Sequence, residues 1–254
     1  MTSHLCPFKF STLAERKSSD NIYHEIFQWK MKEAPKNVNR FCDLSLKASE
    51  RREMVRWLRN LEDKTSSQYL QILFSFSIPS VESLVKIQSL GKPIISAGAG
   101  TGYWEFLLTK FYALDVIAFD SNTSYPESMH YMDIQKGGPE MLKNFEDRAL
   151  LLAWPDKDEE SKFSLECLNY YDGNTIIHVG ELHGETFSSN PWGQSTSRIF
   201  QMEIGKKFRC VYRRRLPNWP GYMDSLSIWC KIESAVDCDG GTFCNVPGFE
   251  TILP

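Results

Sequence analysis

The feature that most constrains this chain is a set of three alternating glycines, Gly98, Gly100 and Gly102, between two apolar segments. The segment before them, PIISAG, has the length and character of a short buried strand, and residues 101–111 show the apolar spacing of a helix. Glycine adopts positive φ angles easily and lets a ligand approach the backbone closely. Parallel sheets bind nucleotide-like ligands at such strand-to-helix turns. The glycine loop therefore predicts an α/β fold with a small-molecule site.

The rest of the chain alternates between strand-like and helix-like segments. We expect further strands at residues 114–119, 128–133, 148–154 and 175–180, and helices at 49–73, 81–90, 138–145, 161–171 and 192–203. Two late strands, at 208–214 and 225–232, have no strong helical segment between them and should form an antiparallel pair. The pattern predicts a Rossmann-like, seven-stranded, mostly parallel sheet with an antiparallel last pair. The predicted boundaries are a helical N-terminal extension (1–74), a ligand-binding domain (75–232) and an irregular tail (233–254).

The spacing of the glycines indicates which ligand the loop suits. A dinucleotide fingerprint needs a third glycine at position 103, which is Tyr103 in this chain. A nicotinamide or flavin enzyme on a related sheet is therefore disfavoured. Asp120 ends the next predicted strand, where its two carboxylate oxygens can accept hydrogen bonds from both hydroxyls of a ribose. Loop and acid together favour a nucleoside ligand that lacks a pyrophosphate.

The segments AGAGTGYWEFLL and DVIAFD resemble the glycine motif and the second-strand acid of class I S-adenosylmethionine-dependent methyltransferases, over roughly residues 75–232. Further segments (SIPSVESL, GGPEML, LLLAWP, HVGE and PNWPGYMDSLSIW) are similar to a little-characterised group of microbial and fungal methyltransferase-like proteins. The resemblance implies S-adenosylmethionine as the cofactor. It also implies the residues that would hold it, which are Ser96, Gly98, Ala99, Gly100, Thr101, Gly102, Tyr103, Asp120, Ser121 and Asp133.

One position departs from the family pattern. The family usually carries an acid two residues before the first glycine, and this chain has Ser96 there. That acid commonly orients the loop and the amine of the cofactor's methionine part. The departure leaves two hypotheses open. One is a methyltransferase, and the other is a non-catalytic module that binds S-adenosylmethionine or a partner protein.

The resemblance also places the chemistry at the end of the fourth strand, at Trp154, Pro155 and Asp156. Methyl transfer needs an aligned acceptor, a site without water and sometimes a base. The proline turn loosely resembles the loop of amino-group methyltransferases, in which an aromatic ring stacks on a flat acceptor. We therefore expect a small-molecule or nucleobase-like acceptor, methylated on nitrogen or oxygen. A tryptophan of the core at a strand end is the alternative.

Several other polar residues could belong to the site. Glu181 ends the fifth strand and could act with His183 as a general base, whereas His178 alternates with apolar residues and is more typical of a core. Residues 75–82, with Glu82 near a helix start, could cover the methionine end of the cofactor or simply cap that helix. The run 213–215, three arginines, could bind an anionic acceptor or guard a solvated sheet edge.

Composition excludes some classes of function. The chain has 29 basic and 32 acidic residues, a net charge of −3, so no global basic field indicates nucleic-acid binding. No apolar run is long enough for a membrane span, and the first residues lack a secretory signal, so we expect a cytoplasmic protein that could form a homodimer. The seven cysteines lack metal-binding spacing. A zinc site at Cys230, Cys238 and Cys244 is the weaker alternative, and we expect no metal.

Overall fold

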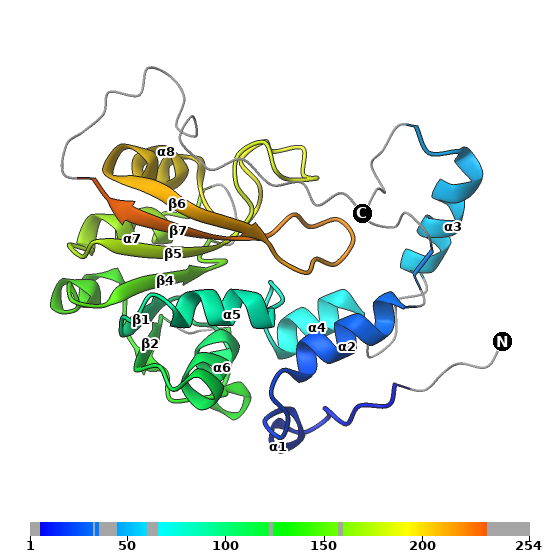
Figure 1. Cartoon of the computed structure of the whole chain (residues 1–254), viewed down its shortest axis with the longest axis horizontal. Helices are drawn as coiled ribbons and strands as arrows, with labels where there is room; N and C mark the ends of the chain where they lie inside the picture. The colour runs from blue at the N-terminus through cyan, green and yellow to red at the C-terminus, as the bar shows by residue number, and fades with distance from the viewer. Residues whose placement is uncertain are drawn as a thin grey trace.

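The computed structural model describes residues 6–32, 34–35, 45–59, 66–121, 124–156 and 160–232. Its centre is a seven-stranded sheet in the order β3-β2-β1-β4-β5-β7-β6 (Figure 1). The strands are β1 (Ile94–Ala97), β2 (Val116–Asp120), β3 (Gln135–Lys136), β4 (Ala149–Ala153), β5 (Thr175–Gly180), β6 (Phe208–Arg215) and β7 (Ser225–Lys231).

The pairing of these strands confirms the predicted fold. β1 pairs in parallel with β2 and β4, β2 with β3, and β4 with β5. β7 runs antiparallel to both β5 and β6. All residues of β5 are buried, as expected for a central strand covered on both faces. The fold is therefore a Rossmann-like, mostly parallel sheet with an antiparallel last pair.

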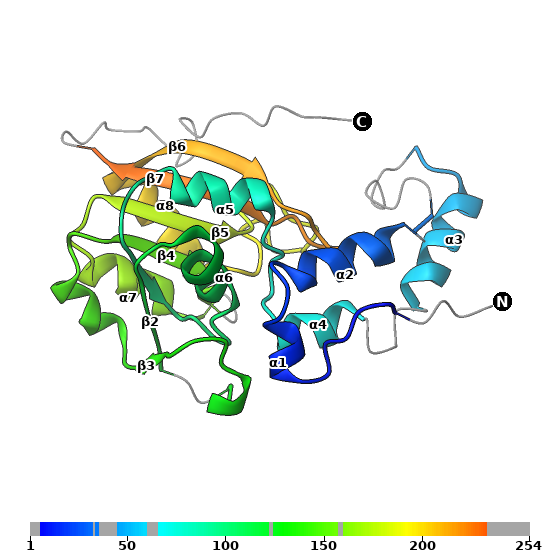
Figure 2. The ribbon, with the colours of Figure 1, turned by 60° about the horizontal axis from the view of Figure 1, so that its bottom comes forward.

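Helices cover both faces of the sheet. α5 (Val81–Gln88) and α6 (Tyr103–Tyr112) pack together on one face, and α7 (Phe163–Tyr170), α8 (Arg198–Lys207) and the 3₁₀ helix η3 (Pro139–Asn144) lie on the other (Figure 2). Neighbouring strand residues divide between the faces, since Leu151 joins the cluster under α5 and α6 and Leu150 joins the cluster under α7 and α8. This alternation is the period of two that β-strands impose.

The N-terminal helices lie beyond the carboxyl ends of the parallel strands (Figures 1 and 2). They are α1 (Leu13–Arg16), α2 (Ile22–Met31), α3 (Ala48–Arg59) and α4 (Ser67–Leu73). The apolar face of α2 shares one core with the sheet domain, and the Trp219 indole donates a hydrogen bond to the Tyr23 hydroxyl at 3.0 Å. The division at residue 74 remains a prediction, but this packing joins the two parts through buried contacts.

Some sequence predictions about single elements were wrong. Residues 128–133 do not form a strand, because a 3₁₀ helix, η2 (Glu127–Met129), precedes an irregular segment, and the third strand is the two-residue β3. The predicted helix 49–73 is two helices, with residues 60–65 outside the described part. α8 begins at Arg198 because Ser197 caps it, accepting a hydrogen bond from the Phe200 N–H. α2 was not predicted.

No helix in the described part of the chain is long and apolar enough to span a membrane. The predicted tail, residues 233–254, lies outside the described residues, as do Cys238 and Cys244. Among the described residues no group of three histidine, cysteine, aspartate or glutamate side chains could hold a metal ion.

Candidate functional site

A cavity of about 680 Å³ opens where the carboxyl ends of β1, β2 and β4 meet the end of α4. Cavities of this size hold small molecules. Its walls come from four parts of the chain: the end of α4 and the residues after it, the glycine loop with the start of α6, the turn after β2, and the turn after β4. The cavity therefore occupies the position that the glycine loop predicted.

The glycine loop has the backbone that its sequence requires. Gly98, Gly100 and Gly102 have φ angles of +74°, +58° and +74°, which residues with a Cβ adopt only with strain. A Cβ on Gly98 would lie 2.9 Å from the Phe163 ring, so this position also lacks space for a side chain. Gly102 ends the loop as the residue that caps α6. The start of α6 and its free N–H groups thus face the cavity.

Asp120 closes the loop from the neighbouring strand. Its Oδ2 accepts a hydrogen bond from the Gly100 N–H at 2.8 Å, and both residues line the cavity. Ser121 follows Asp120 in the cavity wall, and the ring of Tyr125 lies over Gly100. Burial raises the pKa of the Tyr125 hydroxyl, and the nearby Asp120 charge raises it further. The predicted loop and the predicted acid are therefore in contact.

Ser96, at the position where proteins with a similar glycine motif usually carry an acid, contacts an acid from another element. Its Oγ donates a hydrogen bond at 2.5 Å to Oε1 of Glu105, in the first turn of α6. Both residues are buried, and Glu105 lines the cavity. Burial raises the pKa of the Glu105 carboxyl to about 7, with a smaller contribution from Asp120. A carboxyl group thus lies beneath the glycine loop although the strand carries none.

Two predicted cofactor residues mainly hold the loop in place. The Thr101 hydroxyl donates to the carbonyl of Phe74, which ties the loop to the end of α4. The Tyr103 hydroxyl donates to the Asn21 side chain and accepts from the Tyr23 N–H, so its ring lies in the core shared with α2. Both residues, like Ala99, line the cavity.

Trp154 lies at the end of β4 in a group of aromatic side chains. Its ring stacks on Phe76 at a centroid distance of 5.1 Å and meets Tyr222 edge-on at 5.9 Å. Its indole N–H donates to buried Asp224 at 2.9 Å, and its φ of +51° is unusual for a bulky residue. Trp154 and Phe76 line the cavity. We call the pair Trp154 and Phe76 the aromatic wall, which lies on the β4 side of the site.

Pro155 and Asp156 also line the cavity, but Asp156 is bonded to protein donors. Its Oδ1 accepts from the Ser161 hydroxyl and the Ser164 N–H, and its Oδ2 accepts from the Ser164 hydroxyl and the Ser197 N–H. These bonds join the β4 turn to the first turns of α7 and α8. The catalytic role of Asp156 remains a prediction, and its contacts favour a structural one.

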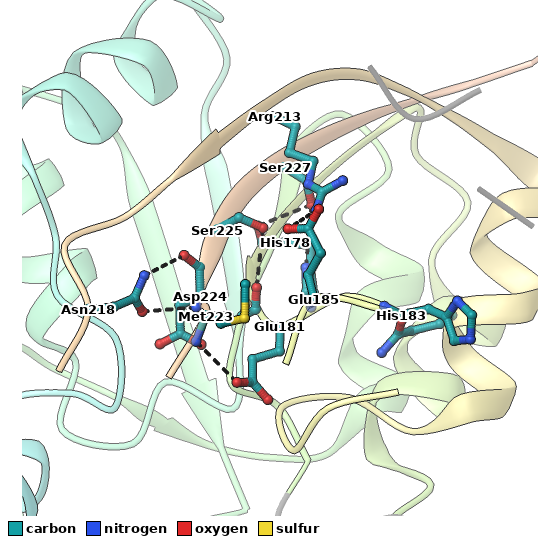
Figure 3. A network of polar contacts seen from close by, with 12 residues as sticks. His178, Glu181, His183, Glu185, Arg213, Asn218, Met223, Asp224, Ser225 and Ser227 are labelled. Atoms are coloured by element: carbon teal, nitrogen blue, oxygen red, sulfur yellow. Dashed lines mark hydrogen bonds and ion pairs between the residues drawn. The ribbon is translucent and has the colours of Figure 1, made fainter. Parts of the chain in front are cut away.

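The polar residues after β5 are not among those that line the cavity. Figure 3 shows the polar contacts that they make instead. Glu181 accepts hydrogen bonds from the Met223 and Gln194 N–H groups and from the Thr186 hydroxyl, and burial raises its pKa. It therefore holds two loops together, and the structure does not bring it to the cavity, where we predicted a base.

The two histidines of this region also lie away from the cavity. His178 is fully buried, and its pKa is lowered to about 3 by burial and then by the Arg213 charge, as expected for a neutral core histidine. The ring of His183 packs at 4.2 Å from that of Trp192. Arg213, the first arginine of the run 213–215, pairs with Glu185. This arginine therefore has a structural partner within the protein.

Asp133, which the resemblance placed near the adenine, is exposed and does not line the cavity. Glu82 is exposed as well, in the first turn of α5, where Ser80 caps the helix, whereas Ser75 and Phe76 of the same predicted segment do line the cavity. Seven further wall residues were not predicted, because they belong to segments distant from the glycine loop: Gln71, Phe74, Ser124, Tyr125, Glu160, Ser161 and Phe163.

No protein-family model matches the chain, and no curated protein matches its sequence. Solved structures show a similar course of the chain. A putative RNA methyltransferase from Pyrococcus horikoshii is 13% identical over 59% of this chain and 83% of that one, with a TM-score of 0.43. TehB from Haemophilus influenzae is 10% identical over 65% and 67%, with a TM-score of 0.42. MtNAS in complex with MTA and tNA is 13% identical over 87% and 75%, with a TM-score of 0.45. The fold assignment rests on the strand order of the chain itself.

Proposed function

We propose that this protein is an S-adenosylmethionine-dependent methyltransferase. The observation that carries the proposal is the contact between Asp120 and the Gly100 N–H in the wall of a cavity that the glycine loop lines. A carboxylate at the end of the second strand can accept hydrogen bonds from ribose hydroxyls, and the loop leaves room for a nucleoside without a pyrophosphate.

The residues of the cavity fit this cofactor. Gly98 has no space for a Cβ because the Phe163 ring lies against it, and both residues line the cavity. The backbone of the loop is therefore directly available to a ligand. Tyr125, which lies over Gly100, offers a half-buried aromatic ring beside the Asp120 carboxylate. When bound, S-adenosylmethionine supplies an electrophilic methyl group on a positively charged sulfur. The acidic side chains of the wall suit a cofactor that carries positive charge.

The acceptor would bind beside β4, against the aromatic wall. Phe76 is partly exposed, and the Trp154 ring is held by its bond to Asp224, so the wall offers a rigid apolar surface to a flat molecule. We propose a small-molecule or nucleobase-like acceptor that is methylated on nitrogen or oxygen. Pro155 and the residues after α4 would orient it and exclude water. The resemblance to the microbial and fungal methyltransferase-like group does not identify the methyl acceptor.

Calorimetry tests the cofactor. We expect S-adenosylmethionine and S-adenosylhomocysteine to bind the wild type and NAD not to bind. Asp120→Ala and Gly100→Arg should abolish binding while the protein remains folded, because one removes the ribose acceptor and the other fills the loop. Glu203→Gln, at a half-buried residue of α8 that pairs with Lys206 and does not line the cavity, is the control. Binding of NAD alone, or unchanged affinity in both loop variants, would refute the proposal.

A non-catalytic binding module is the second candidate. It is favoured by the hydrogen bonds of Asp156 and Glu181, since the acids that we predicted at the reacting end are bonded to protein donors. A screen of acceptor pools with methyl-labelled S-adenosylmethionine separates the two functions. Transfer of label that depends on Trp154 supports the enzyme, and cofactor binding without transfer to any pool supports the module.

A further inference from the structure

Glu105 is a buried acid that faces the cavity. The residue is 2% exposed, yet it lines the cavity from the first turn of α6. Its carboxylate accepts a hydrogen bond from the Ser96 hydroxyl, and it makes no ion pair with any described residue. A carboxyl group without a cation is unusual at this depth, because a buried charge is costly unless it is paired.

The groups around Glu105 are acidic or neutral. Asp120 faces it from the end of β2, and Asp156 and Glu160 lie in the same cavity wall. The other titratable groups of the wall are the hydroxyls of Tyr103 and Tyr125. Among the described residues, no lysine, arginine or histidine lines the cavity. The described part of the cavity wall therefore carries acidic side chains and no basic one.

We propose that Glu105, held by Ser96, receives the ammonium group of the cofactor's amino-acid end and so replaces the acid that this chain lacks at position 96. The inference rests on the proposed function, because it assigns a residue to one part of S-adenosylmethionine. Its basis is the position of the buried carboxyl beneath the glycine loop, where it contacts the Ser96 hydroxyl and makes no ion pair with a described residue.

The ammonium is a better partner than the sulfonium for two chemical reasons. An ammonium donates hydrogen bonds, and a carboxylate accepts them in a strong charge-assisted pair. A sulfonium has no N–H, and a carboxylate facing its methyl group would compete with the acceptor for that group. Glu105 lies under the loop, whereas the aromatic wall for the acceptor is at the end of β4. Glu105 is therefore a binding residue rather than a base.

Binding should depend on pH, because Glu105 is largely protonated below about pH 7 in the free protein. The ammonium pairs with the ionised form, so cofactor binding below this pH must release a proton. Affinity should rise between pH 5.5 and 7.5 and then level off. The change expected from a group that titrates near the upper end of this range is about tenfold or more.

Two ligands and two variants test the inference. S-adenosylhomocysteine carries the ammonium, whereas methylthioadenosine keeps the adenosine and lacks the amino-acid end. For Glu105→Gln we expect roughly tenfold to hundredfold weaker binding of S-adenosylhomocysteine, the range for a hydrogen bond to a charged group. Methylthioadenosine should bind within about twofold of the wild type. Glu82→Gln makes the same change in the first turn of α5, outside the cavity, and should alter neither affinity.

The pH dependence is tested on the wild type, with Glu105→Gln as its control. Proton release is measured by calorimetry of S-adenosylhomocysteine binding at pH 6 in two buffers of different ionisation enthalpy. We expect release on binding to the wild type and none on binding to Glu105→Gln. Adding Ser96→Asp to Glu105→Gln moves the acid back to the strand and should restore affinity for S-adenosylhomocysteine.

The outcomes separate this inference from the proposed function. If the wild type binds neither ligand, the proposed function fails. If the wild type binds both and Glu105→Gln weakens both equally, the residue only shapes the loop and the inference is overturned. Unchanged affinity for S-adenosylhomocysteine in Glu105→Gln, or no proton release from the wild type, also overturns it and leaves the proposed function standing.

Discussion

Glu105→Gln should stabilise the ligand-free protein at neutral and alkaline pH. Glutamine has nearly the shape of glutamic acid and can still accept the hydrogen bond from Ser96. It carries no charge, so the variant does not have to desolvate a carboxylate. A site that favours a ligand cation is thus expected to reduce stability when the ligand is absent.

The magnitude follows from the pKa of Glu105, which burial raises from the ordinary 4.5 to about 7 in the folded protein. Between these values the folded state holds a proton that the unfolded state has lost, so stability falls as pH rises through this window. Because each pH unit is worth about 1.4 kcal/mol, the full difference is about 3 kcal/mol. It is absent below pH 4.5 and complete above pH 7.

Thermal unfolding at pH 5 and pH 8 measures the effect. For a chain of this length, about 3 kcal/mol corresponds to a change of about 6 to 12 °C in Tm. We therefore expect the Tm of Glu105→Gln to exceed that of the wild type by more at pH 8 than at pH 5, by about this amount. Glu82→Gln is the control, because Glu82 is exposed and a hydrogen bond from its own backbone N–H lowers its pKa, which is the opposite of the shift at Glu105. Parallel pH profiles for wild type and Glu105→Gln would refute the reasoning.

Three further variants test single contacts. Asp156→Ala leaves the N–H groups at the starts of α7 and α8 without their acceptor, and we expect a loss of about 3 kcal/mol or more in urea unfolding; a loss below about 1 kcal/mol contradicts this. Gly98→Ala puts a Cβ against the Phe163 ring at a φ of +74°. Calorimetry should therefore show that S-adenosylhomocysteine binds about tenfold or more weakly. Unchanged binding would mean that the loop adapts to the Cβ. Trp154→Phe leaves buried Asp224 without the indole donor, and we expect a loss of about 1 to 3 kcal/mol by urea unfolding, with no change as the contrary result.

The sheet was predictable because its strands are short apolar runs bounded by turns. β1, β4 and β5 stand out in the sequence as PIISAG, ALLLAW and TIIHVG, and each is a buried central strand. β3 was misplaced because a two-residue, exposed edge strand has no apolar run. α2 escaped detection since its buried face includes Tyr23 and Lys30 beside isoleucine and phenylalanine, which weakens the apolar period.

The candidate site was predictable only where one segment builds it. Gly98, Gly100 and Asp120 follow from a local pattern, and the structure brings the loop and the acid into contact. Asp156 and Glu181 stand at strand ends, as catalytic acids do, but local sequence does not show that backbone N–H groups from other segments saturate them. Glu105 was missed for the opposite reason, since a glutamate in a first helical turn is typical of an exposed residue that interacts with the helix dipole.

The hydrogen bond between Tyr23 and Trp219 joins residues 196 positions apart in the chain. On a ribosome that adds about 5 to 20 residues per second, roughly 10 to 40 s separate the synthesis of the two. During that interval α2 can already pack on Phe74 and Tyr103, but Phe27 lacks the Trp219 ring that it meets edge-on at 5.0 Å. Helix α2 therefore completes its packing only when Trp219 has been made, so nascent chains stalled before Trp219 should expose more apolar surface to chaperones than the finished chain does.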